Sequence, residues 1–439
     1  MSSKKNLFQL FVPIAFETLF FMLAGMVDTL MLSSVGDTAV GAVGTANTYI
    51  SVFIMMFNVV STGMIAVMTQ YIGAGREGIA YQAKQLGVFF NAVLGVCLSL
   101  FMCFFSGALL EVVGVAPLLM EHAKIYLQIV GSFCFLNALT PIFSSYLRAF
   151  GHTKQPMIAT IVANVVNLVL NAVFLFVCKW GVAGVAIATV VSRVTNLLIV
   201  MISSHVLVHA KDNPERIANK EVFTKIVKIG LPSAAETMMY NIAMTLTIRF
   251  LNQMDAEGIN VTARSYATQI ANFSYCIGAA LAQANAIMTG WRIGAKQYDE
   301  CDRQTKKAAV VGVLIAAMLE ALLAFSAPIT VGFFTDDPEM IALVQKLLTI
   351  DIALECGRVT NLVFVQSLKT SGDALFTTIM AVIFMFLCMV GGTWFFGIHL
   401  GMMAVGAYIG MALDECVRAV CMFFRWQSGK WRGKSLVQN

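Results

Sequence analysis

Charged residues are scarce in this chain of 439 residues: Asp, Glu, Lys and Arg make up 12% of it, whereas 59% of the residues are hydrophobic. A water-soluble chain of this length would lack the polar side chains needed to cover its surface. The low charge therefore excludes an ordinary soluble protein. It predicts that lipid surrounds much of the molecule.

Other absences narrow the function. The ten cysteines include no Cys-x-x-Cys pair, which argues against a disulfide scaffold and against redox motifs. His205 and His209 have helical spacing but lead into a polar stretch, so no metal site is predicted. No cluster of His, Asp and a nucleophile indicates an enzyme, no basic tail indicates a nucleic-acid partner, and no motif indicates a cofactor.

Long apolar runs take the place of these features. A helix needs roughly 20 apolar residues to cross a bilayer core of about 30 Å. The pattern predicts an all-α membrane protein with about twelve transmembrane helices. These lie near residues 8–32, 40–70, 84–110, 121–147, 155–178, 181–207, 224–252, 259–290, 305–333, 341–368, 375–398 and 401–426.

Basic residues gather at one set of alternate ends of these spans. The opposite ends hold only Lys124, Lys179, Arg249, Arg264 and Lys346. Cytoplasmic loops of membrane proteins carry an excess of Lys and Arg. The distribution therefore predicts that both termini and the polar stretch 208–223 lie in the cytoplasm.

Several motifs appear twice, about 220 residues apart. Pro13 with Glu17 returns as Pro232 with Glu236, and Leu147-Arg148 returns as Leu368-Lys369. Six predicted spans separate the copies, and this even number means that both halves enter the membrane in the same direction. Repeats of this kind are typical of carriers that rock two bundles around a central site. A transporter is the first functional hypothesis.

The most polar stretch of the chain joins the two halves. We therefore predict an N-lobe at residues 1–207, a cytoplasmic linker at 208–223, a C-lobe at 224–426 and a cytoplasmic tail at 427–439.

The motifs resemble those of a known family. They are Tyr71-Ile-Gly-Ala-Gly75-Arg, the run from Tyr146 to Thr153, Asn167 to Asn171 followed by Gly181 to Thr189, and Leu368-Lys-Thr-Ser-Gly-Asp373. Together they are similar to multidrug and toxic compound extrusion (MATE) transporters, most of all to the bacterial DinF-like side of the family. The resemblance implies a V-shaped, monomeric, two-lobe carrier in the plasma (inner) membrane. Such a carrier exports organic, often cationic small molecules in exchange for protons or sodium ions.

One acid in the first span is the leading candidate for ion coupling. Ionisable groups are costly inside a bilayer, so each is a functional candidate. The candidates within the predicted spans are Glu17, Asp28, Arg193, Glu236, Glu320, Asp351, Glu355, Arg358, Asp414, Glu415 and Arg418. Glu17 has the counterpart Glu236 in the second half. The position equivalent to Asp28 is occupied by Thr247, so this acid is unique to the N-lobe. The resemblance implies that Asp28 forms a cation or proton site with Asn167, Asn171 and Thr189. Asn171 departs from the acid that some members carry there, and the alternative is a polar cluster that only holds helices together.

The second half offers a more ambiguous set. Asp351 and Glu355 lie four residues apart on one helical face, where mutual repulsion suits a proton carrier. Glu355 with Arg358 and Asp414 with Arg418 have the spacing of ion pairs, which favours a structural role. Some family members carry a coupling acid where this chain has Arg358. The candidates for a substrate cavity or a secondary coupling site are Glu17, Glu236, Asp351, Glu355, Arg358 and Asp414.

Two questions stay open at the level of sequence. A carboxylate with Asn and Thr oxygens can coordinate sodium or take up a proton, and we favour the proton. The alternative function is a flippase for lipids or lipid-linked oligosaccharides. Such a flippase would need a cavity dominated by cations to hold pyrophosphate. Here the charged side chains that can face the inside of the helix bundles are mostly carboxylates.

Overall fold

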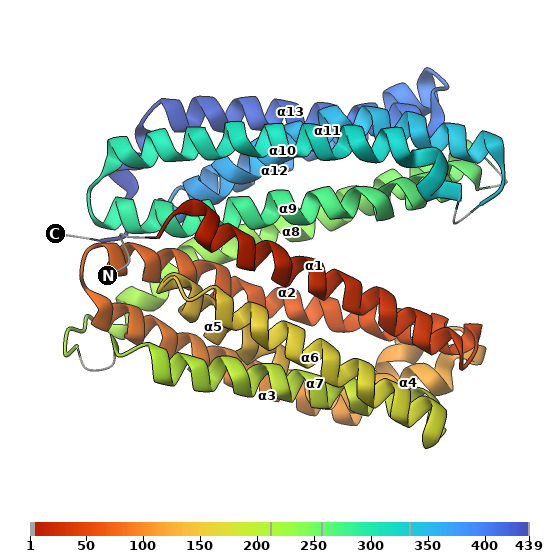
Figure 1. Ribbon diagram of the computed structural model, residues 1–439, viewed down its shortest axis with the longest axis horizontal. Helices are drawn as coiled ribbons and strands as arrows, with labels where there is room; N and C mark the ends of the chain where they lie inside the picture. The colour runs from red at the N-terminus through yellow and green to blue at the C-terminus, as the bar shows by residue number, and fades with distance from the viewer. Residues whose placement is uncertain (1–4, 211–212, 256–257, 333–334, 438–439) are drawn as a thin grey trace. The chain divides into compact units, whose positions relative to one another are not determined.

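The computed structural model describes residues 5–210, 213–255, 258–332 and 335–437, and these ranges contain helices and no strands (Figure 1). Parts of every predicted segment lie outside them: residues 1–4 of the N-lobe, 211–212 of the linker, 256–257 and 333–334 of the C-lobe, and 438–439 of the tail. The chain divides into two compact units, Met1–Gly230 and Leu231–Asn439. The boundary falls inside α8 (Asn219–Met254) because the first turns of this helix pack within unit 1. There the Lys225 ammonium donates a hydrogen bond to the Tyr71 hydroxyl over 2.8 Å.

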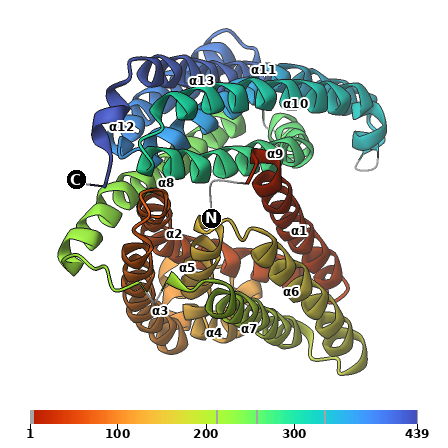
Figure 2. The same ribbon diagram turned by 60° about the vertical axis from the view of Figure 1, so that its left-hand side comes forward.

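Unit 1 contains the helices of the first predicted spans. They are α1 (Leu7–Ser33), α2 (Asp37–Gly73), α3 (Glu77–Val113), α4 (Pro117–Ser132), α5 (Phe135–Ala149), α6 (Lys154–Ala172) with a π-helical extension (Val173–Val177), and α7 (Gly181–Leu207). Helix α1 packs beside α6, as Figure 2 shows. The predicted straight span 121–147 is instead the pair α4 and α5, bent by 46°. At the bend, the Phe135 amide donates a hydrogen bond to Ser99 Oγ over 3.0 Å.

Unit 2 contains the rest of α8 and the later spans. They are α9 (Ile259–Gly294), α10 (Tyr298–Gly332), α11 (Pro338–Thr370), α12 (Ala374–Phe384) with π-helical segments (Met385–Val390 and Thr393–His399), and α13 (Met403–Gln427). Helix α10 lies beside α11 (Figure 1). In the tail, a short helix (Lys430–Lys434) brings Trp431 onto Trp426, with ring centroids 4.1 Å apart. The prediction of an all-α protein with about twelve spanning helices is confirmed.

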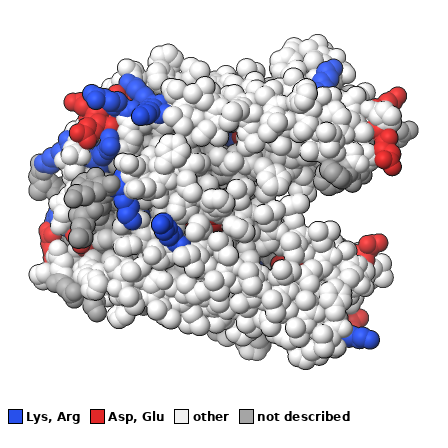
Figure 3. All heavy atoms as spheres, in the orientation of Figure 1, with Lys and Arg blue, Asp and Glu red and all other residues white. Residues whose placement is uncertain are grey.

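The helices differ in how apolar they are. Within the described ranges, seven are long and apolar enough to cross a membrane, or eight if the bent pair is one span. The long helices outside this group are α8, α9, α11 and α13, which are more polar. On the face drawn in Figure 3, Lys, Arg, Asp and Glu gather near the helix ends and the area between is almost uncharged. A surface of this kind suits contact with lipid.

The duplicated turn motifs have the same backbone geometry. The Arg76 amide donates to the Tyr71 carbonyl over 2.8 Å, and the Gln297 amide donates to the Arg292 carbonyl over 2.8 Å. Both bonds close a helix end of the Schellman type, which requires one residue with positive φ. Gly75 supplies it in the first copy with φ of 78°, and Lys296 does so in the second with φ of 59°.

We expect Gly75→Ala to lower the free energy of unfolding by about 1 kcal/mol, because a side chain destabilises this left-handed conformation. Substrate preference should not change, since the turn has no chemical role. Thermal unfolding of the purified protein measures the first effect, and export of two unlike dyes measures the second. Gly44→Ala is the control, because a methyl group there meets nothing within 4 Å. Altered dye preference at normal stability would contradict the prediction.

Candidate functional site

Asp28 and two of the three residues predicted to surround it meet in unit 1. The side-chain amide of Asn171 donates to Asp28 Oδ1 over 2.8 Å and to Asn167 Oδ1 over 3.0 Å. Asn167 and Asn171 are one turn apart on α6 and both are buried, while Asp28 is half-buried on α1. The packing of α1 beside α6 therefore assembles a polar cluster inside an apolar unit.

Thr189 lies outside this hydrogen-bonded cluster. Its hydroxyl donates to the Val185 carbonyl of its own helix over 2.9 Å. One turn further along α7, Arg193 interacts electrostatically with Asp28, and its buried Nη1 has no hydrogen-bond partner among the described residues. Arg193 was predicted as a candidate ionisable residue within a span, but the sequence prediction did not assign it to the coupling site. Its signal was a charge within an apolar span, four residues after Thr189.

The duplicated acids Glu17 and Glu236 each hold a basic residue from the second duplicated motif. Glu17 Oε1 lies 2.6 Å from Arg148 Nη2 in unit 1, and Glu236 Oε2 lies 3.0 Å from Lys369 Nζ in unit 2. All four side chains are at most 15% exposed. The repeat has therefore preserved a buried ion pair, and pairing is the main role that the geometry gives to Glu17.

A cavity of about 420 Å³ lies within unit 2, and its lining comes from α8, α9, α11, the π-helical segment Met385–Val390 and α13. Helices α8, α9, α11 and α13 are thus more polar than the others because their polar residues line this cavity. The charged lining residues are Glu236, Arg264, Asp351, Arg358, Lys369, Glu415 and Arg418. Tyr240, Tyr275 and Tyr408 add aromatic surface. Basic and acidic groups are mixed here, which corrects the expectation that inward-facing charges are mostly carboxylates.

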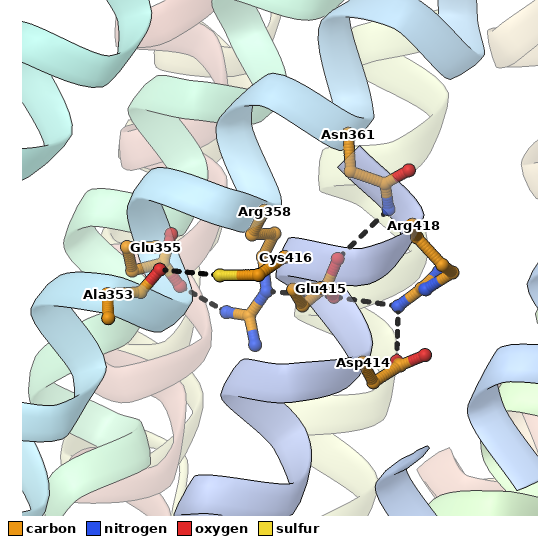
Figure 4. A network of polar contacts seen from close by, with 8 residues as sticks. All are labelled: Ala353, Glu355, Arg358, Asn361, Asp414, Glu415, Cys416 and Arg418. Atoms are coloured by element: carbon orange, nitrogen blue, oxygen red, sulfur yellow. Dashed lines mark hydrogen bonds and ion pairs between the residues drawn. The ribbon is translucent and has the colours of Figure 1, made fainter. Parts of the chain in front are cut away.

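A continuous ion-pair network lies at this cavity, and Figure 4 shows its contacts. Its members Arg358, Glu415 and Arg418 line the cavity. The Arg358 guanidinium contacts Glu355 and, over 3.3 Å, Glu415 Oε1. Glu415 Oε1 also lies 3.0 Å from the Arg418 guanidinium, which contacts Asp414 over 2.6 Å. The pairs within α11 and within α13 are those that the spacing predicts. Glu415, which joins them, was a candidate ionisable residue in the sequence prediction but was not assigned to the site.

The network requires a close approach of α11 and α13. A methyl group on Gly357 would lie 2.9 Å from the Cys416 backbone nitrogen, closer than real contacts allow. Only the absence of a side chain at this position lets Arg358, the next residue, reach Glu415. The Asn361 amide completes the wall by donating to Glu415 Oε2 over 2.9 Å.

Two buried acids beside this network have no such partner. Asp351 is 3% exposed, and Glu320 of α10 is fully buried. Within the described ranges, neither side chain makes an ion pair. Asp351 Oδ2 is buried without a hydrogen-bond partner, and the Glu320 carboxyl group lies near the neutral hydroxyl of Ser274. Glu320 interacts electrostatically with Asp351 and Glu355. Three carboxyl groups therefore come together in unit 2. The sequence predicted that Asp351 and Glu355 are neighbours, and it gave Glu320 as a separate candidate.

Duplicated bundles of apolar helices with ionisable groups inside each half define a multi-pass membrane carrier. The family model MatE matches residues 13–173 and 232–394, one segment in each half. The chain is 33% identical over 438 residues to "Uncharacterized transporter YisQ" of Bacillus subtilis, covering 98% of this chain and 96% of that protein. This chain therefore belongs to the MATE family of multidrug efflux transporters.

Other comparisons agree. "Probable multidrug resistance protein NorM" of Thermotoga maritima is 23% identical over 465 residues, covering 99% of this chain and 94% of that protein. Among solved structures, the fold matches the outward-facing conformation of a multidrug resistance MATE family transporter of the MOP superfamily. The TM-score is 0.89 at 19% identity, with 99% of this chain and 97% of that chain covered. At 19% identity, the match to this solved structure supports the fold alone.

Proposed function

We propose that this protein is an antiporter that exports organic, cationic or amphiphilic compounds across the plasma membrane by alternating access, driven by protons entering the cell. Membership of the MATE family supports export, and the name of the NorM relative supports a broad range of substrates. The observation that carries the coupling proposal is Asp28, a carboxyl group in an apolar unit that accepts a hydrogen bond from the neutral amide of Asn171. Both termini are proposed to be cytoplasmic, and the working unit a monomer.

The hydrogen bonds around Asp28 favour a proton over sodium. The Asn171 amide nitrogen already occupies one oxygen of Asp28 and the side-chain oxygen of Asn167. Thr189 directs its hydroxyl into its own helix. A sodium ion would need several of these oxygens turned toward it, whereas a proton needs only one carboxylate oxygen. Protonation also removes the negative charge that would hold a cationic substrate, so the two ligands compete.

Everted membrane vesicles test the proposal. Vesicles that contain the protein should accumulate the fluorescent cation ethidium when their interior is acidified, and nigericin should stop this accumulation. A sodium gradient without a proton gradient should give no accumulation above that of vesicles lacking the protein. Accumulation driven by sodium alone would mean that sodium, and not the proton, is the coupling ion. Accumulation under neither gradient would contradict ethidium export by this mechanism.

The flippase alternative is less well supported by the unit 2 cavity. Its lining contains four basic and three acidic side chains, and most of them neutralise one another. A pyrophosphate carries several negative charges and would need an excess of unpaired cations.

A further inference from the structure

Most charges that line the unit 2 cavity are already satisfied. Glu236 pairs with Lys369, and Glu415 pairs with both Arg358 and Arg418. Two lining residues remain after these pairs are removed: Arg264 on α9 and Asp351 on α11. They carry opposite charges, and they do not form an ion pair with each other.

Arg264 has no carboxylate partner in the described part of the chain. Its hydrogen bond from Nη2 goes to the sulfur of Met244, a weak acceptor. Its buried Nε has no hydrogen-bond partner among the described residues. A guanidinium has five donors in a planar fork that fits a carboxylate or phosphate, so this side chain has unused capacity to bind an anionic group.

Asp351 presents the opposite charge to the same cavity. Its Oδ2 is buried without a hydrogen-bond partner in the described ranges. Arg358 acts on Asp351 electrostatically, but its ion pairs go to Glu355 and Glu415. A buried carboxylate without a direct partner is costly, and an ammonium group placed beside it would relieve that cost.

The two groups lie near a common aromatic side chain. Tyr408 is 2% exposed, lines the cavity, and interacts electrostatically with both Asp351 and Arg264. The cavity volume of about 420 Å³ falls within the range of sites for small organic ligands, roughly 300–1,000 Å³. Tyr240 and Tyr275 provide apolar and aromatic surface for the body of such a ligand.

We propose that the unit 2 cavity binds zwitterionic organic compounds, with the anionic group on Arg264 and the cationic group on Asp351. This proposal goes beyond the proposed export of cations, in which Asp28 holds the substrate, because it adds a second site and a second substrate class. It needs no binding role for Asp28. The paired residues of the network have a structural role in it, because they hold the wall of the cavity in place.

Three related probes test the proposal: Nε-dansyl-lysine, which is a zwitterion, its methyl ester, which keeps only the ammonium group, and its Nα-acetyl derivative, which keeps only the carboxylate. Binding to the full-length protein in lipid nanodiscs is followed by dansyl emission at neutral pH. The zwitterion should bind about tenfold more tightly than either derivative, since each derivative loses one charge-assisted contact.

The variants separate the two contacts. Arg264→Gln should weaken binding of the zwitterion and the acetyl derivative about tenfold and leave the ester unchanged, and Asp351→Asn should weaken the zwitterion and the ester instead. Unchanged binding of one probe also shows that the variant is folded. Arg249→Gln is the control, because this exposed arginine lies outside the cavity lining and should change none of the three affinities.

Equal affinities of the three probes for the wild type, or equal weakening of all three by Arg264→Gln, would overturn the proposal. This test is independent of the ion gradient. Intact probe binding with no export of ethidium would leave the site standing and reject the antiport mechanism. Intact export of ethidium with equal affinities for the three probes would reject the zwitterion site and leave the antiport mechanism standing.

Discussion

Asp28→Asn should abolish proton-driven export, lowering the rate at least tenfold at matched expression, while the protein still inserts and folds. Asparagine cannot release or take up a proton, and it can still form a hydrogen bond with Asn171. A group whose proton affinity differs tenfold between the two carrier states contributes about 1.4 kcal/mol to coupling, and this contribution disappears with the carboxyl group. Efflux of ethidium from loaded cells under a measured pH gradient determines the rate.

Asp37→Asn is the matched control for this variant. It makes the same chemical change on an exposed residue at the start of α2, outside the cluster of Asp28. Export by this control should stay close to that of the wild type. Efflux of Asp28→Asn equal to that of the wild type would rule out Asp28 as the coupling group. Attention would then move to the buried acids Glu320, Asp351 and Glu355 of unit 2.

The number of spans and the internal repeat could be predicted because both depend on local features. An apolar run of sufficient length indicates a helix by itself, and two copies of one motif are visible without a structure. The bend between α4 and α5 could not be predicted in this way. It involves a contact between Phe135 and Ser99, and nothing in the sequence indicates that these residues meet.

The site was predictable to the extent that its contacts lie within one helix. Residues three or four apart on a helix are neighbours, so the pairs of Glu355 with Arg358 and of Asp414 with Arg418 follow from spacing. The bond from Arg358 to Glu415 crosses between helices and depends on the close approach at Gly357. The unpaired state of Arg264 and Asp351 was even less accessible, because it depends on where every other charge has found a partner.

Arg358→Met should destabilise unit 2 by about 3–5 kcal/mol, because it leaves a buried acid without its cation. Glu355 is fully buried and its ion pair is with Arg358, whereas Glu415 keeps Arg418 and Asn361. The loss should appear as a lower midpoint of thermal unfolding in detergent.

Glu355→Gln should reduce export less than Asp28→Asn does, since the main role of Glu355 is to pair with Arg358.

Glu355→Met combined with Arg358→Met should recover most of the stability lost in the single variant, because removing both members of a buried pair leaves no uncompensated charge. Arg249→Met, which replaces an exposed arginine, should lower stability little and controls for the methionine itself. A double variant as unstable as Arg358→Met would mean that the guanidinium contributes through Glu415 and the α11–α13 contact rather than through Glu355. The arginine would then be a support of the cavity wall, and export should fail in both variants alike.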